Sequence, residues 1–225
     1  MDTRITAIED SALALSTGRV KPHSAFSVGD PDCDTLGYVF EGTGTLLLEH
    51  HREALGRGNA VLVLAGEEAT LVADREGLAL IVVSVGPDAD RHAPLGERQR
   101  IVRLAELGSD GATGGRSFQV LLGPHNGSTR ATLFAGFVPP GKAPWHYHLY
   151  DEIVWLPEGP GRLHIDETTR ELRAESAFRL RPREVHIVEN TGSTVMTVIG
   201  VFTPAGSPSA AYLAADAAAE DRSGG

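Results

Sequence analysis

Two histidines separated by one residue, and a glutamate shortly after them, form the stretch of this sequence best suited to metal chemistry. His146 and His148 lie in "PWHYHLYDE", which ends at Glu152. On a β-strand, residues i and i+2 face the same side, so the two imidazoles would point toward one place. On a helix they would diverge by about 200°, and the three prolines of "VPPGKAPW" disfavour a helix there. The spacing therefore predicts a strand that presents two imidazole ligands.

Glu152 joins these histidines only if the chain bends after them. In an extended chain His146 and Glu152 would lie about 20 Å apart, at roughly 3.3 Å per residue. Two ligands of one ion each lie about 2.1 Å from it, so we expect a hairpin bend at 149–151. A fourth ligand, His186, lies in "LRPREVHIVEN", which is typical of a neighbouring strand. Three neutral imidazoles and one carboxylate suit a divalent ion and leave two octahedral positions open for water, dioxygen or substrate.

The spacing of these residues resembles the two motifs of the cupin superfamily. Three residues separate His148 from Glu152, and six more separate Glu152 from Gly159, as in the first cupin motif. His186 and Asn190, with three residues between them, resemble the end of the second motif.

The sequence departs from the cupin pattern at two places. Four residues separate Gly141 from His146 where the first motif has five, and "RPR" at 181–183 replaces the Pro-x-Gly turn of the second motif. The second departure concerns the turn between strands and not the ligands. The resemblance implies an all-β fold made of cupin-type barrels, also called double-stranded β-helix or jelly-roll barrels.

The chain also resembles itself at an offset of 117 residues. The segment that begins "VFEGTGTLLLEHH" aligns without a gap with the segment that begins "LPEGPGRLHIDET", so that Gly42 matches Gly159. Matching turn glycines and strand-like runs in one register indicate a duplication. We therefore predict a bicupin, with two barrels in tandem. The predicted parts are an N-terminal barrel at 1–89, a connection at 90–115, a metal-binding barrel at 116–206, and a helix with a disordered tail at 207–225.

The N-terminal copy lacks the ligand set. In the same register, Gly29, Pro31, Thr35 and Ala69 take the places of the four ligands. The "HH" pair at 50–51 aligns with a turn between strands. We expect the N-terminal barrel to be free of metal and to serve in packing, dimerisation or shaping of the pocket.

Several polar residues of the C-terminal copy replace apolar or small residues of the N-terminal one. Because strand residues two apart share a face, they form two pairs, Arg162 with His164 and Arg179 with Arg181. One interpretation is a pocket in which the arginines bind an anionic substrate and His164 acts as acid or base. The other is an outer, solvated face.

Composition excludes several classes of protein. Thirty acidic against 20 basic residues give a formal charge of −10, which disfavours nucleic acid and anionic membranes as partners. One cysteine, Cys33, cannot form an internal disulfide, as expected in a reducing compartment. The first sixteen residues carry charges and no apolar run typical of a secretory signal. We therefore expect a cytoplasmic protein.

Three functions agree with this reading. The first is an oxygenase with Fe(II) at the site, which a resemblance to cupin dioxygenases implies; Mn, Ni and Zn are the alternative metals. The second is a metal-dependent isomerase or lyase of a sugar or keto acid, and the third is a non-catalytic module that binds a small ligand. The resemblance further implies a homodimer, paired through a sheet edge, with a small-molecule substrate.

Overall fold

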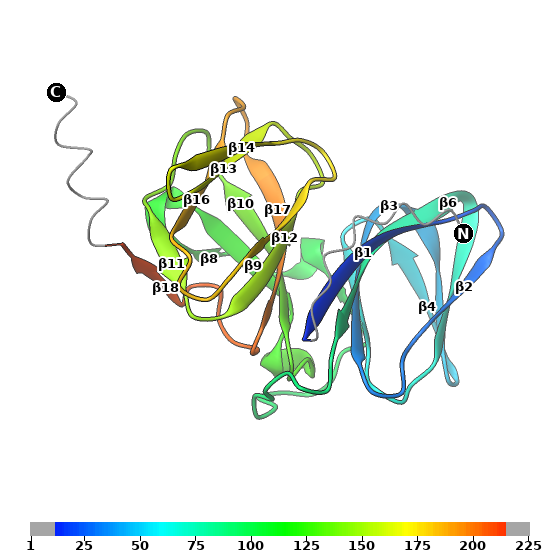
Figure 1. Ribbon diagram of the computed structural model, residues 1–225. Helices are drawn as coiled ribbons and strands as arrows, with labels where there is room; N and C mark the ends of the chain where they lie inside the picture. The colour runs from blue at the N-terminus through cyan, green and yellow to red at the C-terminus, as the bar shows by residue number, and fades with distance from the viewer. Residues whose placement is uncertain (1–11, 215–225) are drawn as a thin grey trace, which may run out of the picture. The chain divides into compact units, whose positions relative to one another are not determined.

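The computed structural model describes residues 12–214, and its regular secondary structure is almost entirely β-strand (Figure 1). The chain divides into two compact units. We call residues 1–107 with 121–133 and 201–206 the N-terminal unit, and residues 108–120 with 134–200 and 207–225 the C-terminal unit. None of the helical segments in the described part has the length and apolar character needed to span a membrane.

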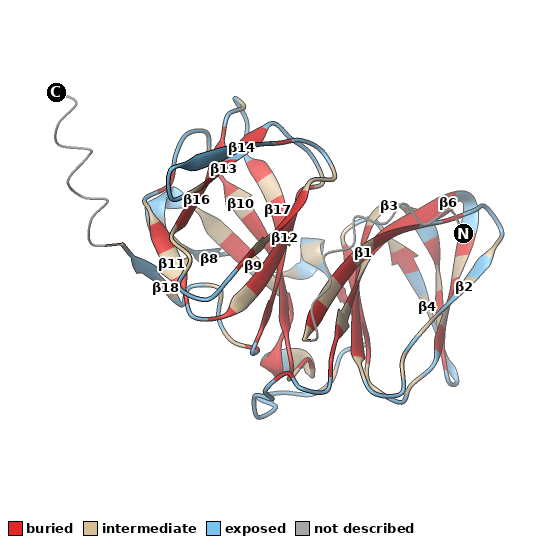
Figure 2. Ribbon diagram, in the orientation of Figure 1, coloured by how far each residue is buried: buried red, intermediate tan, exposed pale blue. Residues whose placement is uncertain are grey.

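The N-terminal unit contains one antiparallel sheet in the order β1-β6-β3-β5-β7, with β2 paired to β6 and β4 to β3. Its strands are β1 (Leu13–Val20), β2 (Ala25–Val28), β3 (Asp34–Leu48), β4 (His51–Gly56), β5 (Asn59–Val63), β6 (Ala69–Val85) and β7 (Ile101–Arg103). Buried and partly exposed residues alternate along β1 (Figure 2), because successive strand residues face opposite sides of the sheet.

Two further sheets follow. A six-stranded sheet has the order β15-β12-β17-β10-β9-β8, and a five-stranded sheet has the order β14-β13-β16-β11-β18. Their strands are β8 (Asp110–Gly111), β9 (Ser117–Leu122), β10 (Thr132–Val138), β11 (His146–His148), β12 (Asp151–Trp155), β13 (Gly161–Ile165), β14 (Thr168–Leu172), β15 (Ala177–Leu180), β16 (His186–Asn190), β17 (Met196–Thr203) and β18 (Ala211–Leu213). The short 3-10 helices are η1 (Leu104–Glu106), η2 (Thr113–Gly115) and η3 (Pro124–Asn126).

The hydrophobic core of the C-terminal unit lies between these two sheets. Val154 of β12 and Leu180 of β15 belong to one sheet, and Leu163 of β13 and Val188 of β16 belong to the other, yet all four pack in one buried cluster. Two antiparallel sheets that enclose one core form a jelly-roll. The predicted all-β, jelly-roll fold is confirmed.

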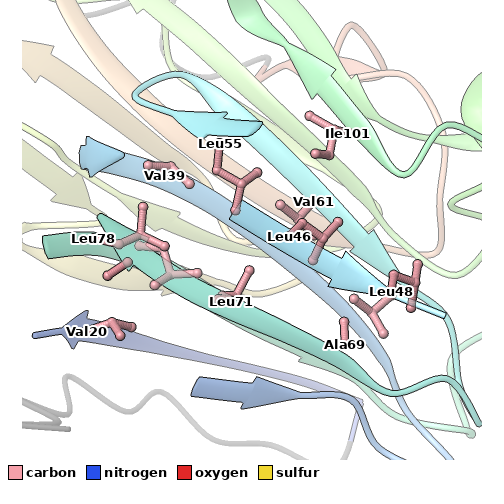
Figure 3. Packing of buried hydrophobic residues seen from close by; sticks show 13 residues of the cluster. Val20, Val39, Leu46, Leu48, Leu55, Val61, Ala69, Leu71, Leu78 and Ile101 are labelled. Atoms are coloured by element: carbon pink, nitrogen blue, oxygen red, sulfur yellow. The ribbon is translucent and has the colours of Figure 1, made fainter. Parts of the chain in front are cut away.

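The two cores bury matching positions of the sequence repeat. Figure 3 shows the cluster of the N-terminal unit, which is aliphatic throughout. Seven of its residues have a partner 117 positions later in the cluster of the C-terminal unit or packed against it. The pairs are Val39 and Leu156, Leu46 and Leu163, Leu48 and Ile165, Leu55 and Leu172, Val61 and Phe178, Val63 and Leu180, and Leu71 and Val188. Register and burial therefore agree along the repeat.

The segment after Pro208 corrects one expectation. We predicted a helix from its alanines, but Ala211–Leu213 form strand β18, which pairs with all three residues of β11. Alanine's helix propensity is worth only tenths of a kcal/mol per residue, and pairing with an exposed strand edge outweighs it. The predicted tail at 215–225 lies outside the described residues.

The predicted connection at 90–115 contains regular structure of its own. The "RIVRL" stretch forms β7, which pairs with β5 of the N-terminal unit, and the 3-10 turn η1 follows directly. Strand β8 and the turn η2 come next and belong to the C-terminal unit.

Candidate metal centre

Three histidines converge from two paired strands of the C-terminal unit. Strand β11 pairs antiparallel with β16, which places His146 opposite His186. The imidazole centroids of His146 and His186 lie 4.4 Å apart, and those of His148 and His186 lie 5.1 Å apart. Tyr147 has the opposite parity and stacks on Tyr212 of β18 instead. The alternation along one short strand thus separates ligand-type side chains from packing side chains.

Glu152 reaches the histidines through a bend, as expected, but not through a hairpin. Strand β11 ends at His148, β12 begins at Asp151, and the two strands belong to different sheets. The chain crosses from one sheet to the other, so the carboxylate approaches the imidazoles from the opposite wall. Its Oε2 atom lies 2.9 Å from Nε2 of His148, and both side chains are buried.

Each of the three imidazoles has its Nδ1 atom bonded to a backbone carbonyl two residues away. His146 bonds the carbonyl of Pro144 at 3.0 Å, and His148 bonds that of Tyr150 at 2.8 Å. His186 bonds the carbonyl of Glu184 at 2.8 Å. A carbonyl only accepts, so Nδ1 carries the proton and Nε2 keeps a free electron pair. Metal-binding histidines are oriented in this way.

The local environment keeps two of these imidazoles neutral. Burial, together with the nearby charge of Arg116, lowers the pKa of His146 to about 4. Burial also lowers the pKa of His186 to about 3. Burial also acts to lower the pKa of His148, but the hydrogen bond and the negative charge of Glu152 outweigh burial, so the pKa of His148 is raised. Neutral imidazole is the form that binds metal.

We tested whether these residues fit a divalent ion. As the side chains stand, no group of three or more His, Cys, Asp or Glu within residues 12–214 is arranged so that it could hold a metal ion. Nevertheless, Nε2 of His148 is buried without a hydrogen-bond partner, although Oε2 of Glu152 lies only 2.9 Å away. Ligands about 2.1 Å from one ion and at right angles to each other are about 3 Å apart. The unsatisfied nitrogen, the fixed tautomers and the nearby carboxylate fit a divalent ion.

The four residues line one cavity of about 250 Å³. This is smaller than the roughly 300–1,000 Å³ of pockets that bind drug-sized ligands, so it suits a small molecule. Besides the ligand candidates, its polar lining includes Arg116, Tyr150 and Ser209. Burial raises the pKa of Tyr150, so its phenol keeps the proton at neutral pH. Most of the remaining lining is apolar.

The comparisons with known proteins agree with this geometry. Residues 134–202 match a family model, that of the cupin domain.

This stretch resembles a cupin domain.

It contains all four candidate ligands. No curated protein sequence matches the chain.

Solved structures show the same fold over most of the chain. AerE from Microcystis aeruginosa is 12% identical, with a TM-score of 0.72 over 88% of this chain and 90% of AerE. A variant of oxalate decarboxylase from Bacillus subtilis is 14% identical, with a TM-score of 0.73 over 90% of this chain and 71% of that one. A further structure of that decarboxylase, described by its Mn(II) centres, is 15% identical with a TM-score of 0.72 over the same shares. At these identities the likeness establishes the fold.

Within the matched stretch, Asn190 joins strands and lies outside the cavity lining. Its Nδ2 donates to the carbonyls of Val138 and Thr194, and its Oδ1 accepts from the N–H of Gly192. Its backbone also pairs with that of Gly141. Two residues of the sequence pattern thus meet at one β-bridge.

The structure does not bring the three predicted substrate-binding arginines to the cavity. Arg162 is exposed and pairs with Glu171, Arg179 pairs with Asp151, and Arg181 is exposed. They alternate with Leu163 and Leu180, which point into the core, so the arginines face outward. The prediction that these arginines line a substrate pocket is therefore wrong, and they lie on the outer face of the sheets.

His164, predicted as acid or base, is also absent from the cavity lining. Its Nε2 lies 2.6 Å from Oε2 of Glu189, and its Nδ1 lies 3.0 Å from Oγ1 of Thr169. Both ring nitrogens are thus engaged on the outer face of the sheet.

The arginine that does line the cavity, Arg116, was missed. Its NH1 atom lies 3.3 Å from Nε2 of His146. It precedes β9, thirty positions before the histidine, and no motif connects the two. The repeat gives no signal either, since its alignment begins only after this residue.

Proposed function

We propose that this protein is a metal-dependent cupin enzyme that acts on a small organic molecule. One divalent ion would be held in the C-terminal unit by the three imidazoles and the carboxylate described above. The observation that carries this proposal is the common orientation of the imidazoles. All three are fixed through Nδ1 and line a shared cavity, where Nε2 of His146 lies 3.3 Å from Arg116 and Nε2 of His148 lies 2.9 Å from Glu152.

Oxygenation, with Fe(II) as the metal, is the leading reaction. When bound, such an ion supplies Lewis acidity and the redox chemistry of dioxygen. The protein's own contribution is to exclude water with apolar walls such as Phe118 and Phe134 and to position the substrate. Tyr150 lines the same cavity, its hydroxyl donates to the carbonyl of Pro208 at 3.4 Å, and burial raises its pKa, so it holds a proton at neutral pH.

A lyase or isomerase reaction with manganese is the second candidate. The similarity to an oxalate decarboxylase whose structure is described by its Mn(II) centres favours it. We predicted His164 as the acid or base, but His164 does not line the cavity, so another residue has to take this role. Apart from the four candidate ligands and Arg116, the titratable residue that lines the cavity is Tyr150. We therefore assign the role of acid or base to its hydroxyl.

We further propose that the N-terminal unit is a second cupin barrel that binds no metal. The seven matching core positions support the duplication. Ala69, which takes the place of His186, is buried among leucines in an aliphatic cluster (Figure 3), and Thr35 stands where Glu152 does in the C-terminal copy.

The reaction class is tested by turnover with two readouts. Apoprotein loaded anaerobically with Fe(II) or Mn(II) is incubated with a panel of small carboxylic acids and sugars. Dioxygen uptake is followed with an electrode, and conversion without dioxygen is followed by proton NMR. Uptake that requires iron supports the oxygenase, and anaerobic conversion supports the lyase or isomerase.

The variant His186→Ala controls for metal in solution and should be inactive in both assays. Full metal loading without conversion of any compound would contradict an enzymatic role. The non-catalytic binding module would then be the function that remains.

A further inference from the structure

Arg116 is held at the cavity by a short β-hairpin. Strands β8 and β9 pair through Asp110 with Phe118 and Gly111 with Ser117. The loop between them is closed by the N–H of Ala112, which donates to the carbonyl of Arg116 at 2.7 Å. The backbone that carries this guanidinium is therefore fixed.

The same hairpin loop packs on the segment that leads into the candidate ligands. Gly114 has a φ of +72°, and a Cβ placed on it would lie only 2.7 Å from Cδ of Pro144. Pro144 in turn supplies the carbonyl that orients His146. A glycine is needed at this contact, because a side chain would push the hairpin off the ligand strand.

The guanidinium lies at the polar end of the cavity. It stands 3.3 Å from Nε2 of His146, and the charge of Glu152 acts on it. Burial lowers the pKa of Arg116, and the charge of Glu152 opposes this effect. Arginine remains protonated in proteins. With a divalent ion nearby, this end of the cavity would carry a net positive charge.

The rest of the cavity is apolar. Three phenylalanines line it, Phe118, Phe134 and Phe137, together with aliphatic residues that include Val154 and Val198. A wholly polar ligand such as a small sugar would leave hydroxyls without partners against this wall, which disfavours its binding.

We propose that Arg116 binds a carboxylate of the substrate and that the substrate is a small organic acid with an apolar body. Arginine's planar fork matches a carboxylate with two hydrogen bonds, and the phenylalanines match the apolar part. This inference deepens the proposed function and rests on it for the word substrate. Carboxylate binding itself can be measured without turnover.

The test compares benzoate with benzamide, which has the same shape but no charge, and with acetate, which has no apolar body. Binding of each is measured by isothermal titration calorimetry in metal-free and in Mn(II)-loaded protein. The variants are Arg116→Gln, Arg116→Lys and, as a matched control, Arg162→Gln, whose arginine is exposed outside the cavity. Thermal unfolding of each variant verifies that it folds.

We expect wild type to bind benzoate at least about tenfold more tightly than benzamide or acetate, since hydrogen bonds to a charged group exceed 1.4 kcal/mol. Arg116→Gln should lose this preference, Arg116→Lys should retain part of it, and Arg162→Gln should retain all of it. Unchanged benzoate binding in folded Arg116→Gln, or equal binding of the three probes to wild type, would overturn the inference.

Metal loading separates this result from the proposed function. If Mn(II) binds but the affinity for benzoate does not depend on Arg116, the inference fails and the metal centre stands. If the affinity for benzoate depends on Arg116 while no metal binds, the carboxylate site stands and the proposed metal-dependent activity is rejected.

Discussion

Gly200 of β17 leaves the space that the Glu152 carboxylate occupies. A Cβ placed on this glycine would lie 2.7 Å from Oε1 of Glu152 and 2.3 Å from the ring of Phe134. Such contacts are too short, so either the carboxylate or the ring has to move. The position of a candidate ligand thus depends on a residue that itself binds nothing.

We therefore expect Gly200→Ala to weaken metal binding by roughly 10–100-fold, the effect typical of residues that orient ligands. Calorimetric titration of Mn(II) into the apoprotein measures it. Gly56→Ala, where a Cβ would meet no atom within 4 Å, is the control and should bind as wild type does. Equal affinity in both variants would show that Gly200 does not position Glu152.

Asn190 illustrates a residue whose place in a sequence motif reflects structure and not ligand binding. Its side chain makes three hydrogen bonds to backbone groups, and it is buried. We expect Asn190→Ala to lower the free energy of unfolding by about 1–3 kcal/mol, because buried backbone groups lose partners. Urea denaturation measures this change. Metal stoichiometry should stay as in wild type, and its loss would mean that Asn190 acts at the metal centre.

At the scale of elements, the two-residue period of strands made most of the site predictable. The shared face of His146 and His148 follows from that period, and the bend before Glu152 follows from the length of an extended strand. His186 was found from the strand-like sequence around it. The predicted hairpin was wrong, because β11 is short and pairs with β16 and β18, while β12 pairs in the other sheet. Local sequence does not reveal which of two sheets a strand joins.

The sequence repeat already indicates on which side of their sheets Arg162 and Arg179 lie. Positions that are aliphatic in both copies, such as Leu46 with Leu163 and Val63 with Leu180, line the two cores. Arg162 and Arg179 are neighbours of such positions and must face the other way. Strand β18 was not predictable, since its pairing with β11 depends on long-range contacts that override the preference of alanine.

An ion pair of the N-terminal unit gives an element-scale prediction. Glu67, just before β6, pairs with Arg98 and accepts the backbone N–H of Leu64. Burial acts to raise the pKa of Glu67, but these partners outweigh it and hold the pKa below its usual 4.5. A carboxylate with a lowered pKa stabilises the fold above its unfolded pKa, and this contribution is lost as pH falls through the folded value.

Glu67→Gln should therefore be less stable than wild type at pH 7, and the difference should shrink between about pH 5 and pH 3. Thermal unfolding across this range measures it. Glu41→Gln removes an ion pair that is exposed and should differ little from wild type throughout. A Glu67→Gln deficit that grows in acid would contradict the assignment.

For the whole molecule, the internal repeat was the strongest feature of the sequence. It predicted two related β units, and the structure buries its matching positions in two similar cores. It did not predict Arg116, because the hairpin that carries this residue lies upstream of the aligned segments. The cavity combines repeated strands, which supply the ligand candidates, with a segment outside the alignment, which supplies a cation.

Metal content is the measurement that tests the account most directly. Untagged apoprotein is reconstituted anaerobically with Fe(II), Mn(II) or Zn(II), desalted, and analysed by plasma mass spectrometry beside His186→Ala and His51→Ala. The account predicts about one ion per chain in wild type and in His51→Ala, whose histidine is exposed, and its loss in His186→Ala. No stoichiometric metal in wild type, or an unchanged content in His186→Ala, would contradict the metal centre.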